Sequence, residues 1–253
     1  MAETREPRLE YVLRLGDSAL VLGQRLSEWC GHAPVLEEEL ALANTALDLL
    51  GQARLLLTRA GQMEGAGRDE DALAFLRDPQ AFRNVTLVEL PNGDFARTVL
   101  RNLLFCAFQE QLWAGLRASS DAELAAIAAK SAKETRYHVE HAADWCVRLG
   151  DGTDESHQRM QEALDTLWPY TAELFTADAV DEAAAATGFG PAWASLEAGW
   201  QKLVRPVLEE ATLAVPAPTA FRSTGKGGVH SEHLGHLLAL MQTLPRSHPG
   251  ARW

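Results

Sequence analysis

The sequence predicts an all-α protein, because apolar residues recur at helical spacing through almost the whole chain. In residues 9–29 the apolar side chains fall three and four positions apart, which places them on one face of a helix of about six turns. The same spacing returns in residues 40–63, 94–113 and 123–149. No segment carries a strand signal strong enough to place a sheet, and no internal repeat is present. Together these observations indicate a bundle of long helices.

Boundary residues support each of these helices. Gly31 and Pro34 end the first, and the acidic run of residues 37–39 suits the N-terminus of the second. A Pro-Asn-Gly turn at residues 91–93 precedes the third helix, and Ser-Ser-Asp at residues 119–121 supplies a cap for the fourth. We therefore expect four long helices, each with its own start and stop signals.

The connection between the second and third helices is the least regular part of the chain. Residues 72–93 contain short helical pieces at residues 71–75 and 83–90. A connection of this length between two helix pairs is typical of the crossover in a ferritin-like bundle. We therefore expect a single ferritin-like domain over residues 1–253, with its core bundle at about residues 8–150.

Additional C-terminal helices are expected in about residues 153–253. The expected helices cover residues 155–167 with an extension through 168–175, residues 191–213, and residues 231–244. Pro191 suits the first position of the second of these helices. Residues 214–228 are rich in Pro, Gly, Ser and Thr, so we expect a loop there.

Composition and charge describe an ordinary globular protein and exclude several kinds of partner. Hydrophobic residues make up 47% and charged residues 23% of the 253 residues. With a formal net charge of −12, we expect no nucleic acid and no membrane as partner, because both require a basic face. No apolar run approaches the roughly 20 residues of a membrane span, and the charged first residues do not form a signal peptide. We expect a cytoplasmic protein.

Cysteine and most tryptophan residues are expected to fill the core. The cysteines form no C-x-x-C pair and lie among apolar helical residues, so we expect buried, reduced thiols at Cys30, Cys106 and Cys146. Three tryptophans lie in apolar helical rows and are expected in the core: Trp29, Trp113 and Trp145. One or two of the remaining four could anchor a subunit contact: Trp168, Trp193, Trp200 and Trp253.

Acidic residues stand on two of the expected helices where a ferritin-like metal site would hold them, at Asp48 and Glu134. Such di-iron sites take one Glu from each of two helices and a Glu-x-x-His pair from each of the other two. The i, i+3 spacing directs carboxylate and imidazole to one helical face. Here the positions three residues after the acids hold Gly51 and Tyr137. This chain therefore has half of the ligands, which favours a partner of an enzyme over the enzyme itself.

Two interpretations of the remaining donor residues stay open. Glu28, Asp48, Glu134 and His138 could form a residual metal site, since Glu134 and His138 stand four residues apart on one helical face. Alternatively, Asp48 and Glu134 are buried acids held in ion pairs or hydrogen bonds, because a buried charge needs a partner. The candidate partners are Arg25, Arg54, Lys133 or a neutral group. We favour this second interpretation, and expect neither a catalytic residue nor a bound metal in this chain.

A glycine-rich segment, Gly-Lys-Gly-Gly at residues 225–228, could hold an anion together with Arg222 through its backbone amides and Lys226. It lacks the spacing of a P-loop and no strand precedes it, so we favour a flexible loop that packs against a partner. Histidines follow at three-residue steps and are expected to form a solvent-facing or interface stripe: His230, His233 and His236.

Several motifs in order along the chain carry a resemblance to a known family. They are residues 11–17, 24–34, Leu47-Asp48-Leu49-Leu50-Gly51-Gln52-Ala53-Arg54, Lys133-Glu134-Thr135-Arg136-Tyr137-His138, and residues 150–153 and 224–235. Together they span nearly the whole chain, and they closely resemble the C subunit of bacterial phenylacetyl-coenzyme A epoxidase. The match is specific because the motifs are long and occur in the expected order.

This resemblance implies a ferritin-like bundle within a multicomponent monooxygenase of aerobic phenylacetate catabolism. In that family a catalytic A subunit holds the di-iron centre and epoxidises the aromatic ring, and a reductase subunit supplies electrons from NADPH. The resemblance implies a structural, non-catalytic subunit without a cofactor of its own, which braces the A subunit and meets the reductase indirectly. We expect long faces of the first helices to pack against the A subunit. A homodimer in isolation is a further expectation.

Two other function classes remain open at this point. In one, the chain is itself a ferritin-like oxygenase that acts through its residual carboxylate and histidine site. In the other, it is a docking module that binds coenzyme A through Arg222 and Lys226. The net charge of −12 counts against a strong site for a polyanion on the isolated chain.

Overall fold

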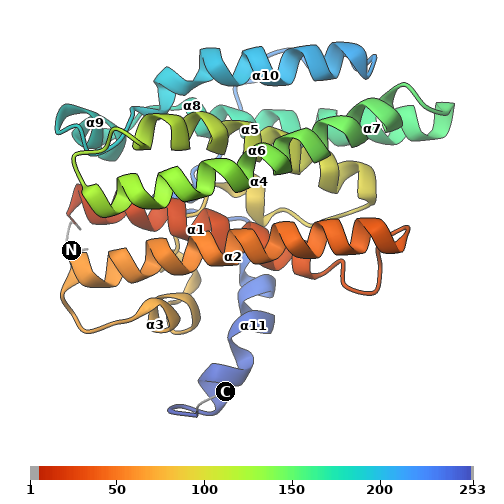
Figure 1. The fold of residues 1–253 in the computed structure, drawn as a ribbon. Coiled ribbons are helices and arrows are strands. Elements are labelled where there is room, and N and C mark those ends of the chain that lie inside the picture. The colour runs from red at the N-terminus through yellow and green to blue at the C-terminus, as the bar shows by residue number, and fades with distance from the viewer. Residues whose placement is uncertain (1–5, 252–253) are drawn as a thin grey trace. The chain divides into compact units, whose positions relative to one another are not determined.

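Helices alone make up the regular structure of residues 6–251, the part of the chain that the computed structural model describes (Figure 1). The expected all-α class is confirmed. The chain divides into two compact units, one from Met1–Pro91 with Ser223–Trp253 and the other from Asn92–Arg222. We call them unit 1 and unit 2. The single domain expected over the whole chain stays a prediction.

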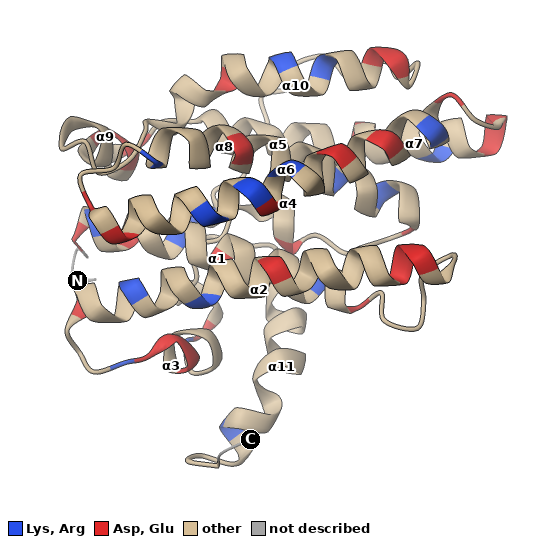
Figure 2. Cartoon of the chain, viewed as in Figure 1, with Lys and Arg blue, Asp and Glu red and all other residues tan. Residues whose placement is uncertain are grey.

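Unit 1 is built on a pair of long helices, α1 (Pro7–Ser27) and α2 (Leu36–Glu64), which pack against each other along their length. The acidic first turn of α2 is red in Figure 2. Glycines on α1 allow the close approach: a Cβ on Gly16 would lie 2.9 Å from Leu57 Cδ2. Both helices lie where the apolar spacing predicts them.

The crossover and the C-terminal segment complete unit 1. The crossover contains α3 (Glu70–Phe75), the 3-10 turn η1 (Pro79–Ala81) and α4 (Thr86–Glu89). The helical piece expected at residues 83–90 is therefore shorter, because Val85 and Leu90 are extended. The last helix, α11 (Glu232–Ser247), packs on all three crossover elements.

Unit 2 is built on a second pair of long helices, α5 (Phe95–Leu116) and α6 (Ala122–Gly150). Their facing side chains include Trp113, whose indole donates a hydrogen bond of 3.1 Å to Thr135 Oγ1. Aspartate caps fix both starts: Asp121 accepts from Leu124 N, within the cap expected at residues 119–121, and Asp94 accepts from Arg97 N, each at 2.9 Å. Two long helix pairs separated by a long connection are the element order of a ferritin-like bundle.

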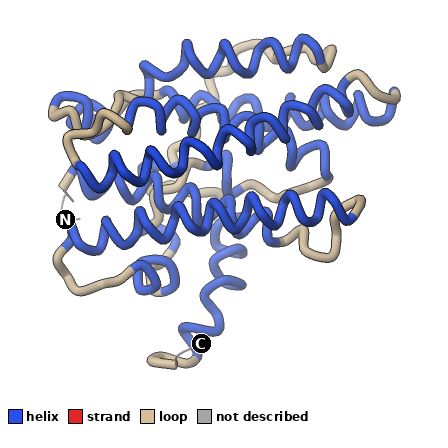
Figure 3. The backbone as a smooth tube through the Cα atoms, in the orientation of Figure 1, coloured by secondary structure: helices blue, strands red, loops and turns tan. Residues whose placement is uncertain are grey.

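Shorter helices follow α6 in unit 2, some joined by loops and others directly continuous, as Figure 3 shows. They are α7 (Asp154–Leu167), η2 (Trp168–Thr171), α8 (Ala172–Phe175), α9 (Ala179–Ala186), η3 (Trp193–Leu196) and α10 (Glu197–Glu210). Helix α9, whose N-terminus is capped by Asp178, is absent from the helices expected on sequence grounds. The next helix was expected to start at Pro191, two residues before η3 begins.

No helix among residues 6–251 is both long enough and apolar enough to cross a membrane.

Candidate functional site

The candidate metal residues of unit 1 are not arranged as ligands. Glu28 follows the last residue of α1, is exposed, and its Oε1 accepts a hydrogen bond of 2.8 Å from Arg25 Nη1. Asp48 is half-buried on α2, and Gly51 stands one turn further along that helix. Glu28 and Arg25 therefore form an ion pair of the kind expected for Asp48 and Glu134.

The candidate metal residues of unit 2 lie on α6. Glu134 is partly exposed and pairs at 3.7 Å with Lys130, one turn away, a lysine that was not among the candidate partners. His138 is buried on the same helix, with the ring of Tyr137 centred 6.5 Å from its own. Within residues 6–251, no three side chains of His, Cys, Asp or Glu gather closely enough to hold a metal ion. The expected absence of a metal stays a prediction.

A densely bonded group of buried polar side chains lies in unit 1 and begins at Asp17 on α1. Asp17 is fully buried and faces Arg77, which is only 3% exposed. Arg77 Nη1 donates to Asp17 Oδ2 at 3.0 Å, its Nη2 donates to Oδ1, and the backbone N–H of Arg83 donates to Oδ2 at 2.8 Å. The guanidinium also lies 4.3 Å from the ring centre of Phe82. This buried ion pair ties the crossover to α1.

A second buried carboxylate, Glu89 at the end of α4, ties the crossover to the C-terminal segment. Its Oε2 accepts from Asn84 Nδ2 and faces His230 Nδ1, both at 2.8 Å, and its Oε1 accepts from Ser231 N at 2.5 Å. The backbone carbonyl of Glu89 accepts from Arg25 Nε and Nη2 at 3.1 and 2.6 Å. We call Asp17, Arg77, Glu89, Arg25 and His230 the polar cluster.

Each ring nitrogen of His230 faces an acceptor, an arrangement that favours the protonated imidazolium form. Nδ1 faces the Glu89 carboxylate, and Nε2 lies 3.1 Å from the carbonyl oxygen of Phe82. Burial acts to lower the pKa of His230, but the hydrogen bond and charge of Glu89, the Phe82 carbonyl and the charge of Asp17 outweigh it, so its pKa lies above the ordinary 6.5. His230 is therefore not solvent-facing as part of the expected stripe, whereas His236 is exposed. That the stripe forms an interface stays a prediction.

The glycine-rich segment packs against the crossover of its own unit. Gly225 N donates to Thr86 Oγ1 at 3.2 Å, and a Cβ on Gly225 would lie 2.6 Å from the carbonyl oxygen of Asn84. Gly228 has a φ of 88°, in the left-handed region that favours glycine. Lys226 is only 5% exposed. The expected flexibility is therefore corrected, because the segment is held by its own chain; its packing against a partner stays a prediction.

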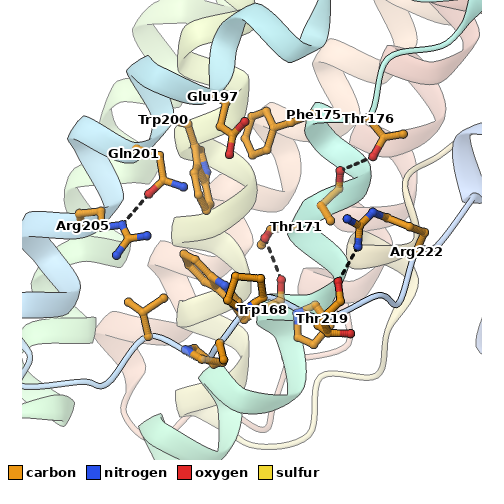
Figure 4. A pocket seen from close by; sticks show the side chains of 16 residues that line it. Trp168, Thr171, Phe175, Thr176, Glu197, Trp200, Gln201, Arg205, Thr219 and Arg222 are labelled. Carbon is orange, nitrogen blue, oxygen red and sulfur yellow. Dashed lines mark hydrogen bonds between the residues drawn. The ribbon is translucent and has the colours of Figure 1, made fainter.

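Arg222, the other candidate for binding an anion, is exposed in unit 2 and lines a cleft of about 610 Å³. Its Nη1 donates to the carbonyl oxygens of Thr219 and Phe221 at 2.8 and 2.6 Å. The cleft lies among η2, α8, α10 and the proline-containing segment after α10, and Figure 4 shows its lining side chains. The cleft was not predicted from the sequence. The sequence features that could have indicated it are the Trp-Pro pair at residues 168–169 and the prolines at residues 216 and 218, which all line it.

A row of exposed apolar side chains runs along α2. Leu36, Leu40 and Leu47 are 68%, 57% and 66% exposed, and Ala43 between them is exposed as well. These positions follow one another at steps of four, three and four residues, so they share one face of the helix. We call these four residues the α2 stripe. An apolar helical row of this kind, open to solvent, is typical of an interaction surface.

Cysteine positions partly follow expectation. Cys106 and Cys146 are buried, and burial raises the pKa of Cys106 to about 12, which makes it an inert core thiol. Cys30 is exposed, so its expected core position is wrong. The reason is that α1 ends at Ser27, so Cys30 no longer continues the buried face of that helix.

Of the tryptophans expected in the core, Trp113 is 1% exposed, whereas Trp29 and Trp145 are only half-buried. Trp193 and Trp200 are buried, and Trp200 Nε1 donates to the carbonyl oxygen of Leu104 at 2.8 Å. These two therefore do not lie on the surface, where a subunit contact would need them. Trp253 lies outside the described residues.

Comparison with known proteins agrees with these features. The family described as "Phenylacetic acid catabolic protein" matches residues 1–253. The C subunit of the 1,2-phenylacetyl-CoA epoxidase of Escherichia coli (strain K12) is 52% identical over 243 residues, which cover 96% of this chain and 98% of that protein. The chain therefore belongs to the phenylacetic acid catabolic protein family.

Proposed function

We propose that the protein is the structural, non-catalytic subunit of a multicomponent phenylacetyl-CoA epoxidase and braces a catalytic di-iron subunit. Its similarity to the C subunit of the Escherichia coli enzyme supports the assignment to that complex. The residues also favour a structural role: Gly51 and Tyr137 stand where the metal-binding pattern needs histidine, and Glu28 and Glu134 each pair with a cation of their own helix region.

The α2 stripe is the observation that carries the structural role. A long helix whose leucines face solvent on one side suits burial against a helix of another subunit, where each leucine would gain about 1.5–3 kcal/mol from complete burial. A di-iron subunit must hold its ligands within about half an ångström, and helices packed from outside restrict how far the ligand-bearing helices move. The occupant we assign to the stripe is therefore the catalytic subunit.

We expect the double substitution Leu40→Glu and Leu47→Glu to weaken association with the catalytic subunit by about a hundredfold or more. Unpaired carboxylates in an apolar interface cost roughly 3 kcal/mol or more, whereas both positions tolerate charge in the free chain because they are exposed. The measurement is co-purification from co-expressing cells through a tag on the catalytic subunit, followed by analytical ultracentrifugation.

Leu240→Glu supplies the matched control, because Leu240 is 80% exposed on α11 and lies outside the stripe. It should co-purify like the unsubstituted chain. Co-purification of the double variant at unchanged stoichiometry would show that the stripe does not contact the catalytic subunit. If the double substitution instead converts a dimer of the isolated chain to monomer and leaves the complex intact, the stripe is an interface between two copies of this chain.

A further inference from the structure

The cleft of unit 2 has the features of a ligand site, and the proposed structural role does not involve it. Its volume, about 610 Å³, falls in the range of small-molecule sites. One wall is aromatic: the rings of Trp168 and Trp200 are centred 5.5 Å apart, and those of Phe175 and Trp200 5.1 Å apart. Trp200 is buried and held in place by its hydrogen bond to the carbonyl oxygen of Leu104. Trp168 is only half-buried and offers its ring to a ligand.

Two arginines in the cleft have no carboxylate partner. Arg205 Nε donates to Gln201 Oε1 at 2.7 Å, and Arg222 bonds only to backbone carbonyls. Within residues 6–251 neither guanidinium forms an ion pair, in a chain whose net charge is −12. Figure 4 shows them on different sides of the cleft, with Trp168 and Thr171 between them. Guanidinium groups match phosphate geometry and bind it in a bidentate manner.

We propose that this cleft binds an adenosine-type ligand with phosphate groups at two separate positions, as coenzyme A and NADP⁺ both have. The base stacks on Trp168, since stacking of a base on an aromatic side chain is favourable. Arg205 and Arg222 each hold one phosphate position. Glu197, which also lines the cleft, accepts a hydrogen bond from the amino group of the base. A ligand of a different class, an aromatic carboxylate, fits the cleft less well, because its negative charge would lie near the carboxylate of Glu197. The proposal rests on the cleft alone and not on the proposed function.

Calorimetric titration of the full chain with coenzyme A, NADP⁺ and ADP tests the proposal. We expect coenzyme A or NADP⁺ to bind at least tenfold more tightly than ADP, which lacks the second phosphate position. The one of these two compounds that binds more tightly identifies the class of ligand that the cleft takes. Arg205→Gln and Arg222→Gln should each weaken that binding about tenfold or more, because a hydrogen bond to a charged group is lost.

Arg117→Gln is the matched control, because Arg117 is an exposed arginine of the same unit that does not line the cleft. It should leave the affinity unchanged. Absence of binding by both coenzyme A and NADP⁺ at about 1 mM ligand overturns the proposal, as does unchanged affinity in both arginine variants. Because the titration uses the chain alone, its result is independent of whether the chain co-purifies with a catalytic subunit.

Discussion

Replacing Asp17 by Asn should destabilise the protein by about 3–5 kcal/mol, the usual cost of removing one partner of a buried ion pair. Asn keeps the shape of the side chain but loses the negative charge that Arg77 faces. The Arg77 side chain is only 3% exposed, so water cannot replace the lost partner. The measurement is the free energy of unfolding from urea denaturation at neutral pH.

Asp71→Asn is the control for this substitution, because Asp71 is an exposed aspartate on α3. It should change the free energy of unfolding by less than about 0.5 kcal/mol. The double variant Asp17→Leu with Arg77→Met should recover part of the loss, since it removes both charges together. A loss below about 1 kcal/mol for Asp17→Asn would show that the pair contributes little and that the cluster is not what holds the crossover on α1.

Gly225→Ala should destabilise the protein by about 1–3 kcal/mol, the usual cost of adding a methyl group to a packed site. The new Cβ would lie 2.6 Å from the carbonyl oxygen of Asn84 and 2.8 Å from the backbone nitrogen of Thr86. Backbone atoms cannot turn aside as a flexible side chain can, so the C-terminal segment must shift. We expect faster amide exchange in α11, measured by hydrogen exchange, together with a lower melting temperature.

Gly227→Ala is the closest available control, two residues along the same segment. Its Cβ would have no atom within 4 Å, so both the melting temperature and the exchange of α11 should stay as they are. If Gly225→Ala behaves like Gly227→Ala, then the segment is not held tightly against residues 84–86.

Local sequence patterns are sufficient to predict the long helices, but not which distant segments of the chain pack against them. The starts of α5 and α6 follow from Asp94 and Asp121, because a cap depends on residues three positions apart. The return of α11 to unit 1 depends on contacts such as that between Glu89 and His230, which are 141 residues apart. No spacing rule connects such residues, so the sequence alone wrongly predicts a surface position for His230.

The leucines of α2 show a related difficulty. Helical spacing correctly marks Leu40 and Leu47 as part of an apolar row, but spacing does not tell which row is buried within the chain. Only the structure shows that these leucines are exposed while Leu49 and Leu56 are buried. In the candidate site, by contrast, the missing histidines at residues 51 and 137 are visible from the sequence. The partner of Glu134 also follows from helical spacing, because Lys130 stands four residues away on the same helical face, whereas Lys133 is the immediate neighbour and faces elsewhere.

We propose that this chain supports oxygen chemistry without performing it. The most direct test is the iron and zinc content of the isolated chain, measured by elemental analysis after expression with added iron. We predict well under one metal ion per chain, because the donor set departs from the di-iron pattern at Gly51 and Tyr137. A content close to two irons per chain would contradict this claim, and would identify the chain as an oxygenase in its own right.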